Sequence, residues 1–189
     1  YEKYWFPMEQ SYGNEYATRF NWFVRDYLSV KTGVIPTIGK VYEDFKTYVQ
    51  SNKSPSSITE VVQDIFKYSG YYVNMVLRKE KDPELRKLFS NILKLKVDVS
   101  YPFLLPVYND YIDKIITIDE FKEIIKLVEN YVFRRAICGI PTNSLNKTFV
   151  TLYRSIDISR YLESVEAAFQ LMENYKRFPN DVEFKREII

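Results

Sequence analysis

The sequence predicts an all-α protein, an irregular multi-helix bundle of about eight helices. Apolar residues recur three and four positions apart along most of the 189 residues, which is the spacing of one helix face. Pairs of a short polar residue and a later Glu precede several of these stretches, as they do at helix starts. Strict alternation of apolar and polar residues, which is typical of a strand, stands out in residues 93–101.

The first predicted helix covers residues 14–31 and ends near Gly33. The second follows Thr37, whose hydroxyl suits an N-cap. The segment SNKSPSS is expected to be a loop, and a third helix opens with a capping box of Ser57 and Glu60. The apolar residues that define these helices are Phe20, Phe23, Val24, Tyr27, Leu28, Val41, Phe45, Val49, Val61, Ile65, Tyr68, Tyr72 and Met75.

The middle of the chain gives weaker signals. Gly70 lies inside the third helix at a cost of about 1 kcal/mol, which would allow a kink there. Asp82 and Pro83 supply a cap and a first-turn proline for a fourth helix. Residues 93–101 alternate like a strand, but a short strand without a partner is marginal. We therefore predict a helix end and an extended link into the segment YPFLLP, with a strand as the alternative.

The most clearly marked helix covers residues 117–137. Thr117 and Glu120 form a capping box at its start, and Gly139 and Pro141 end it. Further helices are expected at residues 143–155, at residues 158–174 and after the cap residues Asn180 and Glu183. Together these helices suit a single helical domain over residues 1–189, or two subdomains that meet near residues 81–116.

The composition excludes most catalytic chemistry. The chain has no histidine and one cysteine, which excludes Ser-His-Asp and Cys-His nucleophiles, HNH-type nuclease chemistry and zinc sites made of His or Cys. It has no GxxxxGK[ST] and no GxGxxG phosphate loop, and acidic runs such as residues 110–120 lack the convergent spacing of a metal site. We therefore expect no enzyme, no metal and no cofactor in this chain, and Cys138 as a small buried core residue.

Charge and hydropathy limit the partners. A net charge of +2 does not indicate a strongly basic nucleic-acid binder, so any such contact has to come from a local patch. Aromatic residues at 17% favour a ring-rich core over a base-stacking surface. No apolar run approaches about 18 residues, so no membrane span is expected, and the single cysteine fits a reducing cytoplasm.

One stretch has a marked charge asymmetry. Between Glu129 and Asp157 the sequence contains no acidic residue. Basic and amide side chains in this span can contact phosphates, and they are the candidate DNA or anion contacts: Arg134, Arg135, Asn143, Asn146, Lys147 and Arg154. The helix at residues 143–155 is expected to bury Leu145, Phe149 and Leu152 and to place Asn143, Lys147, Val150 and Arg154 on its opposite face. A simple solvated polar face is the alternative.

Arg135 needs a separate explanation. On a helical wheel with Phe121 at zero, Arg135 lies at about 320°, between the apolar positions. A buried guanidinium needs a partner, because an unpaired buried charge is very costly. Two interpretations stay open: a structural ion pair or bonds to carbonyls at helix ends, or a side chain that points into a cleft and binds an anion.

The segments NYVFRRAICGIPTNSLNKTFVTLYRSID and RFPNDVEFK resemble part of the GmrSD-type modification-dependent restriction proteins. FNWFVRDYLSVKTGVIPTIGKVYEDFKTY and YPFLLPVYNDY are similar to the middle region of that family, so the resemblance covers most of the chain. Those proteins join a ParB-like nucleotide-hydrolysing domain to an HNH nuclease domain, the domains of unknown function 262 and 1524. The D-G-Q-x-R type motif and the nuclease histidines of the family have no counterpart here.

The resemblance therefore implies the helical region between two catalytic domains, without either of them. Its partners would be those flanking domains of the same chain, and DNA. Because the chain begins with Tyr1 rather than Met, we expect a fragment of a larger nucleotide-dependent nuclease that acts on foreign or modified DNA in phage defence. The alternative is a stand-alone helical protein-interaction module.

Overall fold

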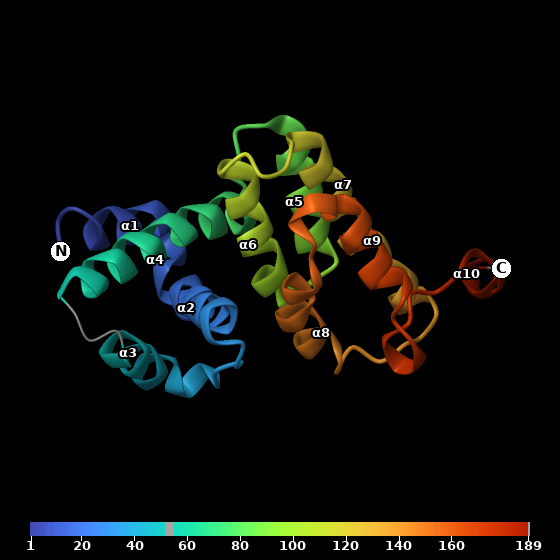
Figure 1. The fold of residues 1–189 in the computed structure, drawn as a ribbon, viewed down its shortest axis with the longest axis horizontal. Helices are drawn as coiled ribbons and strands as arrows, with labels where there is room; N and C mark the ends of the chain where they lie inside the picture. Colours follow the sequence, from blue (N-terminus) through green and yellow to red (C-terminus); the bar gives the residue numbers. More distant parts are fainter. Residues whose placement is uncertain (52–54, 189) are drawn as a thin grey trace. The chain divides into compact units, whose positions relative to one another are not determined.

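The computed structural model describes residues 1–51 and 55–188, with side chains for all of these except residues 55–57. Its regular elements are all helices, and the described residues include no strand, which confirms the predicted all-α fold class (Figure 1). The chain divides into two compact units, Tyr1–Glu80 (unit 1) and Lys81–Ile189 (unit 2). The single domain of the sequence prediction stays a prediction, and the units are described separately.

Unit 1 is built around aromatic rings. Its α-helices are α1 Trp5–Tyr12, α2 Tyr16–Thr32, α3 Val41–Ser51 and α4 Pro55–Val76. The buried ring of Phe23 lies 6.4 Å from that of Tyr12 and 5.4 Å from that of Tyr72, measured between centroids. Such pairs add about 0.5–1.5 kcal/mol each beyond the burial of the rings. These rings join α1, α2 and α4, so the aromatic residues of unit 1 fill a core, as predicted.

Several boundaries of unit 1 differ from prediction. A 3-10 helix, Ile38–Lys40, precedes α3, and Thr37 makes no side-chain capping bond. The predicted side-chain cap is therefore wrong, and a 3-10 turn, closed by Lys40 N–H donating to the Thr37 carbonyl at 2.8 Å, stands between Thr37 and α3. α4 begins at Pro55, since proline suits a first helical turn, so the end of the expected loop is helical. Residues 52–54 of that loop and the capping side chain of Ser57 lie outside the described residues.

Two other features of unit 1 concern helix continuity. α4 continues through Gly70 to Val76 as one helix, and α2 ends at Gly33 in the left-handed conformation, φ 73°, as expected. α1 was not predicted from the sequence. Its buried residues are only Met8 and Tyr12, which are too few to produce a helical period.

Unit 2 is arranged around α7. Its α-helices are α5 Pro83–Lys94, α6 Tyr101–Ile112, α7 Ile118–Ile137, α8 Leu145–Leu152, α9 Tyr161–Gln170 and α10 Asp181–Ile188. α5, α6, α9 and α10 all pack against α7, and Figure 1 shows α5 and α9 beside it. The start of α7 is the predicted capping box: Glu120 N–H donates to the Thr117 hydroxyl at 3.2 Å, and Thr117 N–H donates to the Glu120 carboxylate at 2.7 Å. The Asp82 cap of α5 is confirmed as well.

The predicted extended link after α5 is wrong, and so is its strand alternative. α5 ends in a reversal in which Lys96 takes the left-handed conformation, φ 55°. Lys96 N–H donates to the Leu93 carbonyl at 3.1 Å, and Val97 N–H donates to the Ile92 carbonyl at 3.4 Å, which is the Schellman pattern. Val97 is buried and packs into the core at this helix end. The alternation of Leu95 and Val97 in the sequence therefore comes from a helix end and not from a strand.

The segment YPFLLP is also helical, as the first half of α6. Nine of the twelve residues of α6 are buried, so the helix is apolar on nearly all sides and shows no amphipathic period. Pro102 lies in the first turn, where a proline costs little. Pro106 removes one interior backbone hydrogen bond, and the buried surroundings of α6 offset that loss.

Candidate functional site

The end of α7 forms a rigid joint. Gly139 adopts φ 62°, its N–H donates to the Ala136 carbonyl at 3.3 Å, and Ile140 N–H donates to the Arg135 carbonyl at 2.9 Å. This Schellman ending confirms the predicted stop at Gly139. Cys138 is half-buried rather than fully buried, since it caps the helix outside the core-facing stripe, and partial desolvation raises the pKa of its thiol.

Arg135 lies on the core face of α7, as the wheel predicts, and is only 1% exposed. Its Nη1 donates to the Tyr175 carbonyl at 2.8 Å and its Nη2 to the Pro141 carbonyl at 2.8 Å. Its guanidinium also lies over the Tyr131 ring, 5.1 Å from the centroid. Burial lowers the pKa of Arg135. This is the geometry of a structural guanidinium bound to carbonyls near a helix end; direct anion contact by Arg135 stays a prediction.

The segment 174–180, which we call the strap, is held along α7 through its backbone. Side chains from α7 donate to carbonyls of the strap: Tyr131 to Lys176 at 2.8 Å, Arg135 to Tyr175 at 2.8 Å and Arg134 to Pro179 at 3.2 Å. The strap begins with a 3-10 helix, Asn174–Lys176. The Tyr175 side chain is not used in this docking and remains 60% exposed.

Arg134 attaches the C-terminal helix. Its guanidinium pairs with Asp181 at 2.6 Å and lies 4.8 Å from the centroid of the Phe184 ring. A second ion pair, between Arg177 and Glu183, joins the strap to α10. The predicted cap is present, with Glu183 N–H donating to the Asn180 side chain at 2.9 Å. Arg134 is therefore occupied by α10, and its DNA contact stays a prediction.

The docking of α10 is expected to weaken in acid. Hydrogen bonds from Arg134 and from Arg177 lower the pKa values of Asp181 and Glu183 below their ordinary 3.8 and 4.5. Because the folded-state values are lowered, these pairs stabilise the docked helix above the ordinary values, and that contribution is lost as the pH falls through the lowered ones. NMR signals of Val182 and Phe184 should shift as the pH falls from about 5 to about 2. Asp181→Asn should show part of the shift at neutral pH, and an α10 unchanged in acid would contradict this account.

A pocket of about 430 Å³ opens between the strap and the start of α8, and we call it the strap pocket. Its lining residues are Pro141, Asn143, Ser144, Lys147, Tyr175 and Lys176. Among these described lining residues there are two lysines, one amide and two hydroxyl side chains but no carboxylate. Since an unopposed pair of ammonium groups attracts anions, the pocket is suited to a phosphate or another anionic group.

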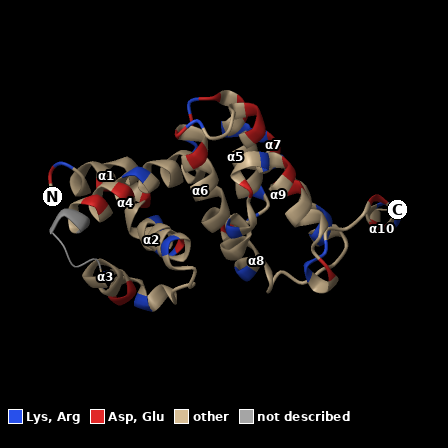
Figure 2. Cartoon of the chain, viewed as in Figure 1, with Lys and Arg blue, Asp and Glu red and all other residues tan. Residues whose placement is uncertain are grey.

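The other predicted contacts lie beside the strap pocket. Asn146 lines a separate cavity of about 310 Å³, together with Arg135 and Asn143. Arg154 is exposed on the 3-10 helix Tyr153–Ser155. Lys147, Thr151 and Arg154 follow at spacings of four and three and are all exposed, so they form one stripe on the surface that starts at the pocket. Lys147 is the charged residue of α8 (Figure 2).

The polar face predicted for α8 is narrower than expected. Val150 was placed on it, but Val150 is buried, as is Thr148. α8 packs against both α6 and the 3-10 helix Asp98–Ser100, so two neighbours cover more of its circumference than a single core would. The prediction for Val150 is wrong for that reason, and the predictions that Leu145, Phe149 and Leu152 face the core are confirmed.

The sequence reasoning missed Tyr175 and Lys176. They lie 18 and 19 residues beyond Asp157, where the acid-free span ends, and their carbonyls, which dock the strap, carry no signal in the sequence. A partial signal was present: the run YKRF, residues 175–178, combines aromatic and basic residues, a mixture seen in surfaces that bind single-stranded nucleic acid.

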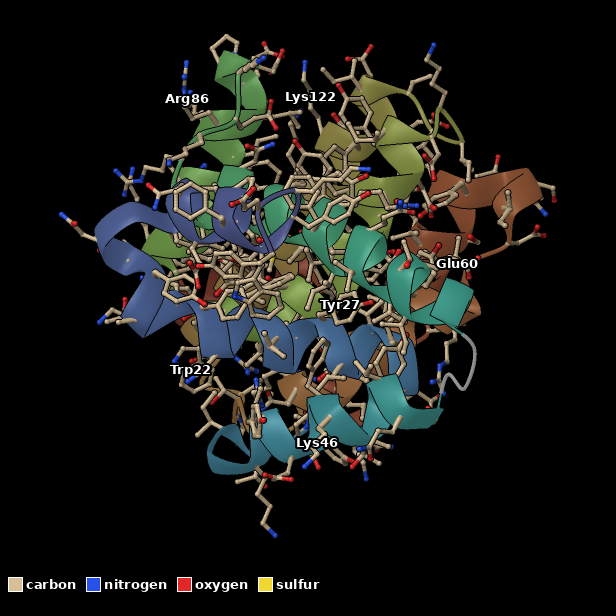
Figure 3. All side chains as sticks on the ribbon, turned by 90° about the vertical axis from the view of Figure 1, so that its left-hand side faces the viewer. Trp22, Tyr27, Lys46, Glu60, Arg86 and Lys122 are labelled. Carbon is tan, nitrogen blue, oxygen red and sulfur yellow. The ribbon has the colours of Figure 1, made fainter. Side chains whose placement is uncertain are left out.

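A second polar cluster lies in unit 1. A pocket of about 490 Å³ is lined by Tyr27, Lys31, Tyr48, Glu60, Val61, Gln63, Asp64 and Lys67. Lys31 pairs with Asp64 at 2.6 Å, and the Tyr27 hydroxyl donates to the same carboxylate at 2.8 Å. Figure 3 shows Tyr27 between α2 and α4. Because Asp64 is bound by both Lys31 and Tyr27, we interpret this cluster as a structural network.

The described part of the chain contains no group of three or more His, Cys, Asp or Glu side chains placed to hold a metal ion. None of its described helices is long and apolar enough to cross a membrane. Comparisons of the chain with family models, with curated proteins and with solved structures give no match.

Proposed function

We propose that this chain is a non-catalytic helical module that binds the phosphate backbone of nucleic acid through the strap pocket and the adjoining stripe of α8. The observation that carries the proposal is the lining of the strap pocket, in which Lys147 and Lys176 meet Asn143 without a facing carboxylate. Lysine and amide side chains are the usual phosphate contacts of DNA-binding proteins. Arg154 extends the same basic surface.

The resemblance in the sequence supports a wider setting for this module. In that setting the chain is the helical region of a nucleotide-dependent restriction endonuclease, joins its nucleotide-hydrolysing and HNH nuclease domains, and acts in the cytoplasm on foreign or modified DNA. The rigid joint after α7 and the backbone-docked strap suit a connecting element, because they fix the direction of the chain between helices.

Gel-shift titrations of DNA over a salt series test the phosphate contact. Lys147→Ala and Lys176→Ala should each make the slope of log affinity against log salt shallower by about one, because each lysine releases about one counterion. At physiological salt each change should weaken binding about fivefold. The control is Lys114→Ala, which removes the same charge from an exposed turn before α7, at the end remote from the strap. Salt-independent binding, or equal losses in all three variants, would contradict the proposal.

A stand-alone protein-interaction module is the second candidate, and the surface of α10 favours it. α10 has no buried residue, and Val182 and Ile188 are 80% and 58% exposed. Exposed apolar side chains on a docked helix are typical of protein contacts. The reading frame beyond both ends distinguishes the candidates, since flanking catalytic domains favour the first and their absence favours the second.

A further inference from the structure

The Tyr175 ring is a feature of the strap pocket that phosphate binding does not require. Among the described aromatic side chains of unit 2, only Phe133 is exposed as Tyr175 is. Phe133 packs against Phe184 at 5.9 Å between centroids, whereas no ring of the described residues covers Tyr175. An uncovered ring that lines the same pocket as Lys147 and Lys176 offers a flat apolar face next to an anion site.

The backbone that carries the ring is also held in place. The Tyr175 carbonyl accepts from Arg135, and the next carbonyl, that of Lys176, accepts from the Tyr131 hydroxyl, both at 2.8 Å. The backbone on either side of the ring is thus fixed before any ligand arrives. A ligand that stacks on Tyr175 therefore loses little free energy to ordering of the strap.

We propose that the strap pocket takes an unpaired nucleotide of a single-stranded polynucleotide, with its base against Tyr175 and the neighbouring phosphates on Lys147 and Lys176. This inference rests on the proposed function and specifies its ligand. The pocket volume of about 430 Å³ falls in the range of small-ligand sites, about 300–1,000 Å³. Asn143 supplies both a donor and an acceptor for a base edge.

Duplex DNA does not satisfy this arrangement. Inside a duplex both faces of each base are covered by its neighbours, so a protein ring can stack only on a base that is unpaired or extruded. The proposal therefore predicts that single strands bind more tightly than a duplex of the same sequence. Phosphate contacts alone, on Lys147 and Lys176, predict no such preference.

Titration of single-stranded DNA that carries 2-aminopurine tests the stacking directly. The wild-type chain should quench the fluorescence of this base. Tyr175→Ala should remove the quenching and weaken binding about 10- to 100-fold, and Tyr175→Phe should retain both. Tyr175→Ala keeps the carbonyl that docks the strap, so its melting temperature should stay unchanged. Tyr42→Ala, which removes an exposed ring of unit 1, is the matched control.

Each outcome decides between the two proposals. If Tyr175→Ala has no effect, or if duplex binds as tightly as single strand, the stacking inference is overturned, while losses in Lys147→Ala and Lys176→Ala would leave phosphate binding in place. If no polynucleotide binds, both proposals are overturned. Quenching with single-stranded DNA or with RNA of the same sequence supports stacking, and the difference in affinity identifies the sugar.

Discussion

Arg135→Leu is expected to lower the free energy of unfolding by about 3 kcal/mol, because two charge-assisted hydrogen bonds are lost and each contributes about 1.5–3 kcal/mol. The removal of a desolvated charge offsets part of that loss. Arg135 joins the end of α7 to the Pro141 turn and to the strap, so the variant should lose both of these attachments and keep those of Tyr131 and Arg134. For a unit of this size the melting temperature should fall by about 10–20 °C, measured by circular dichroism.

The control for Arg135→Leu is Lys147→Leu, which makes the same change of charge at an exposed position. It should change the stability by less than about 0.5 kcal/mol. The stability and the nucleic-acid binding of Arg135→Leu together decide between the interpretations of Arg135 that the sequence leaves open. An Arg135→Leu protein that keeps its melting temperature and loses nucleic-acid binding would show that the guanidinium serves the ligand and not the fold.

Asp110→Ala should be at least as damaging, with a loss of about 3–5 kcal/mol. Asp110 is 5% exposed and accepts from two hydroxyls, that of Tyr153 at 2.8 Å and that of Tyr161 at 2.6 Å. The carboxylate thereby ties α6 to the start of α9. Hydrogen bonds to a charged group contribute about 1.5–3 kcal/mol each, and alanine leaves the hydroxyls without an acceptor. Urea unfolding followed by tyrosine fluorescence measures the loss.

Tyr153→Phe and Tyr161→Phe separate the two bonds of Asp110. Burial raises the pKa of Tyr153, and its hydrogen bond to Asp110 raises it further, so this phenol stays protonated and donates throughout the neutral range. Each phenylalanine variant should lose less than Asp110→Ala, and a double-mutant cycle with Asp110 should show a coupling of about 1 kcal/mol or more. Losses below about 1 kcal/mol in Asp110→Ala would show that water replaces the carboxylate.

The sequence predicts those helices of this chain that have one buried face and a marked start. α5 and α7 are of this kind, since the Asp82 cap and the Thr117 capping box announce them. α6 was missed because burial on nearly all sides removes the period that reasoning from the sequence depends on. The sequence prediction missed the turn at Lys96, because a buried residue at a helix end and a buried residue in a strand give the same pattern of apolar and polar residues.

The candidate site shows a similar division. The helical wheel correctly placed Arg135 on the core face, since that depends only on the geometry of one helix. Its partner carbonyl at Tyr175 lies 40 residues away, and only the tertiary fold brings the two together. Lys176 enters the strap pocket through the same docking. The pattern within one helix therefore locates Arg135, but it does not locate the strap residues that Arg135 holds in place.

The docking of the strap through its carbonyls has an evolutionary consequence. Every residue offers the same carbonyl group whatever its side chain, so Tyr131 and Arg135 would hold positions 175 and 176 of the strap equally well with other side chains there. Substitutions at positions 175 and 176 would then change which ligand the pocket prefers without changing the stability of the fold. Sequence diversity among homologues should therefore concentrate at positions 175 and 176, while the α7 side chains that bind the strap carbonyls stay constant.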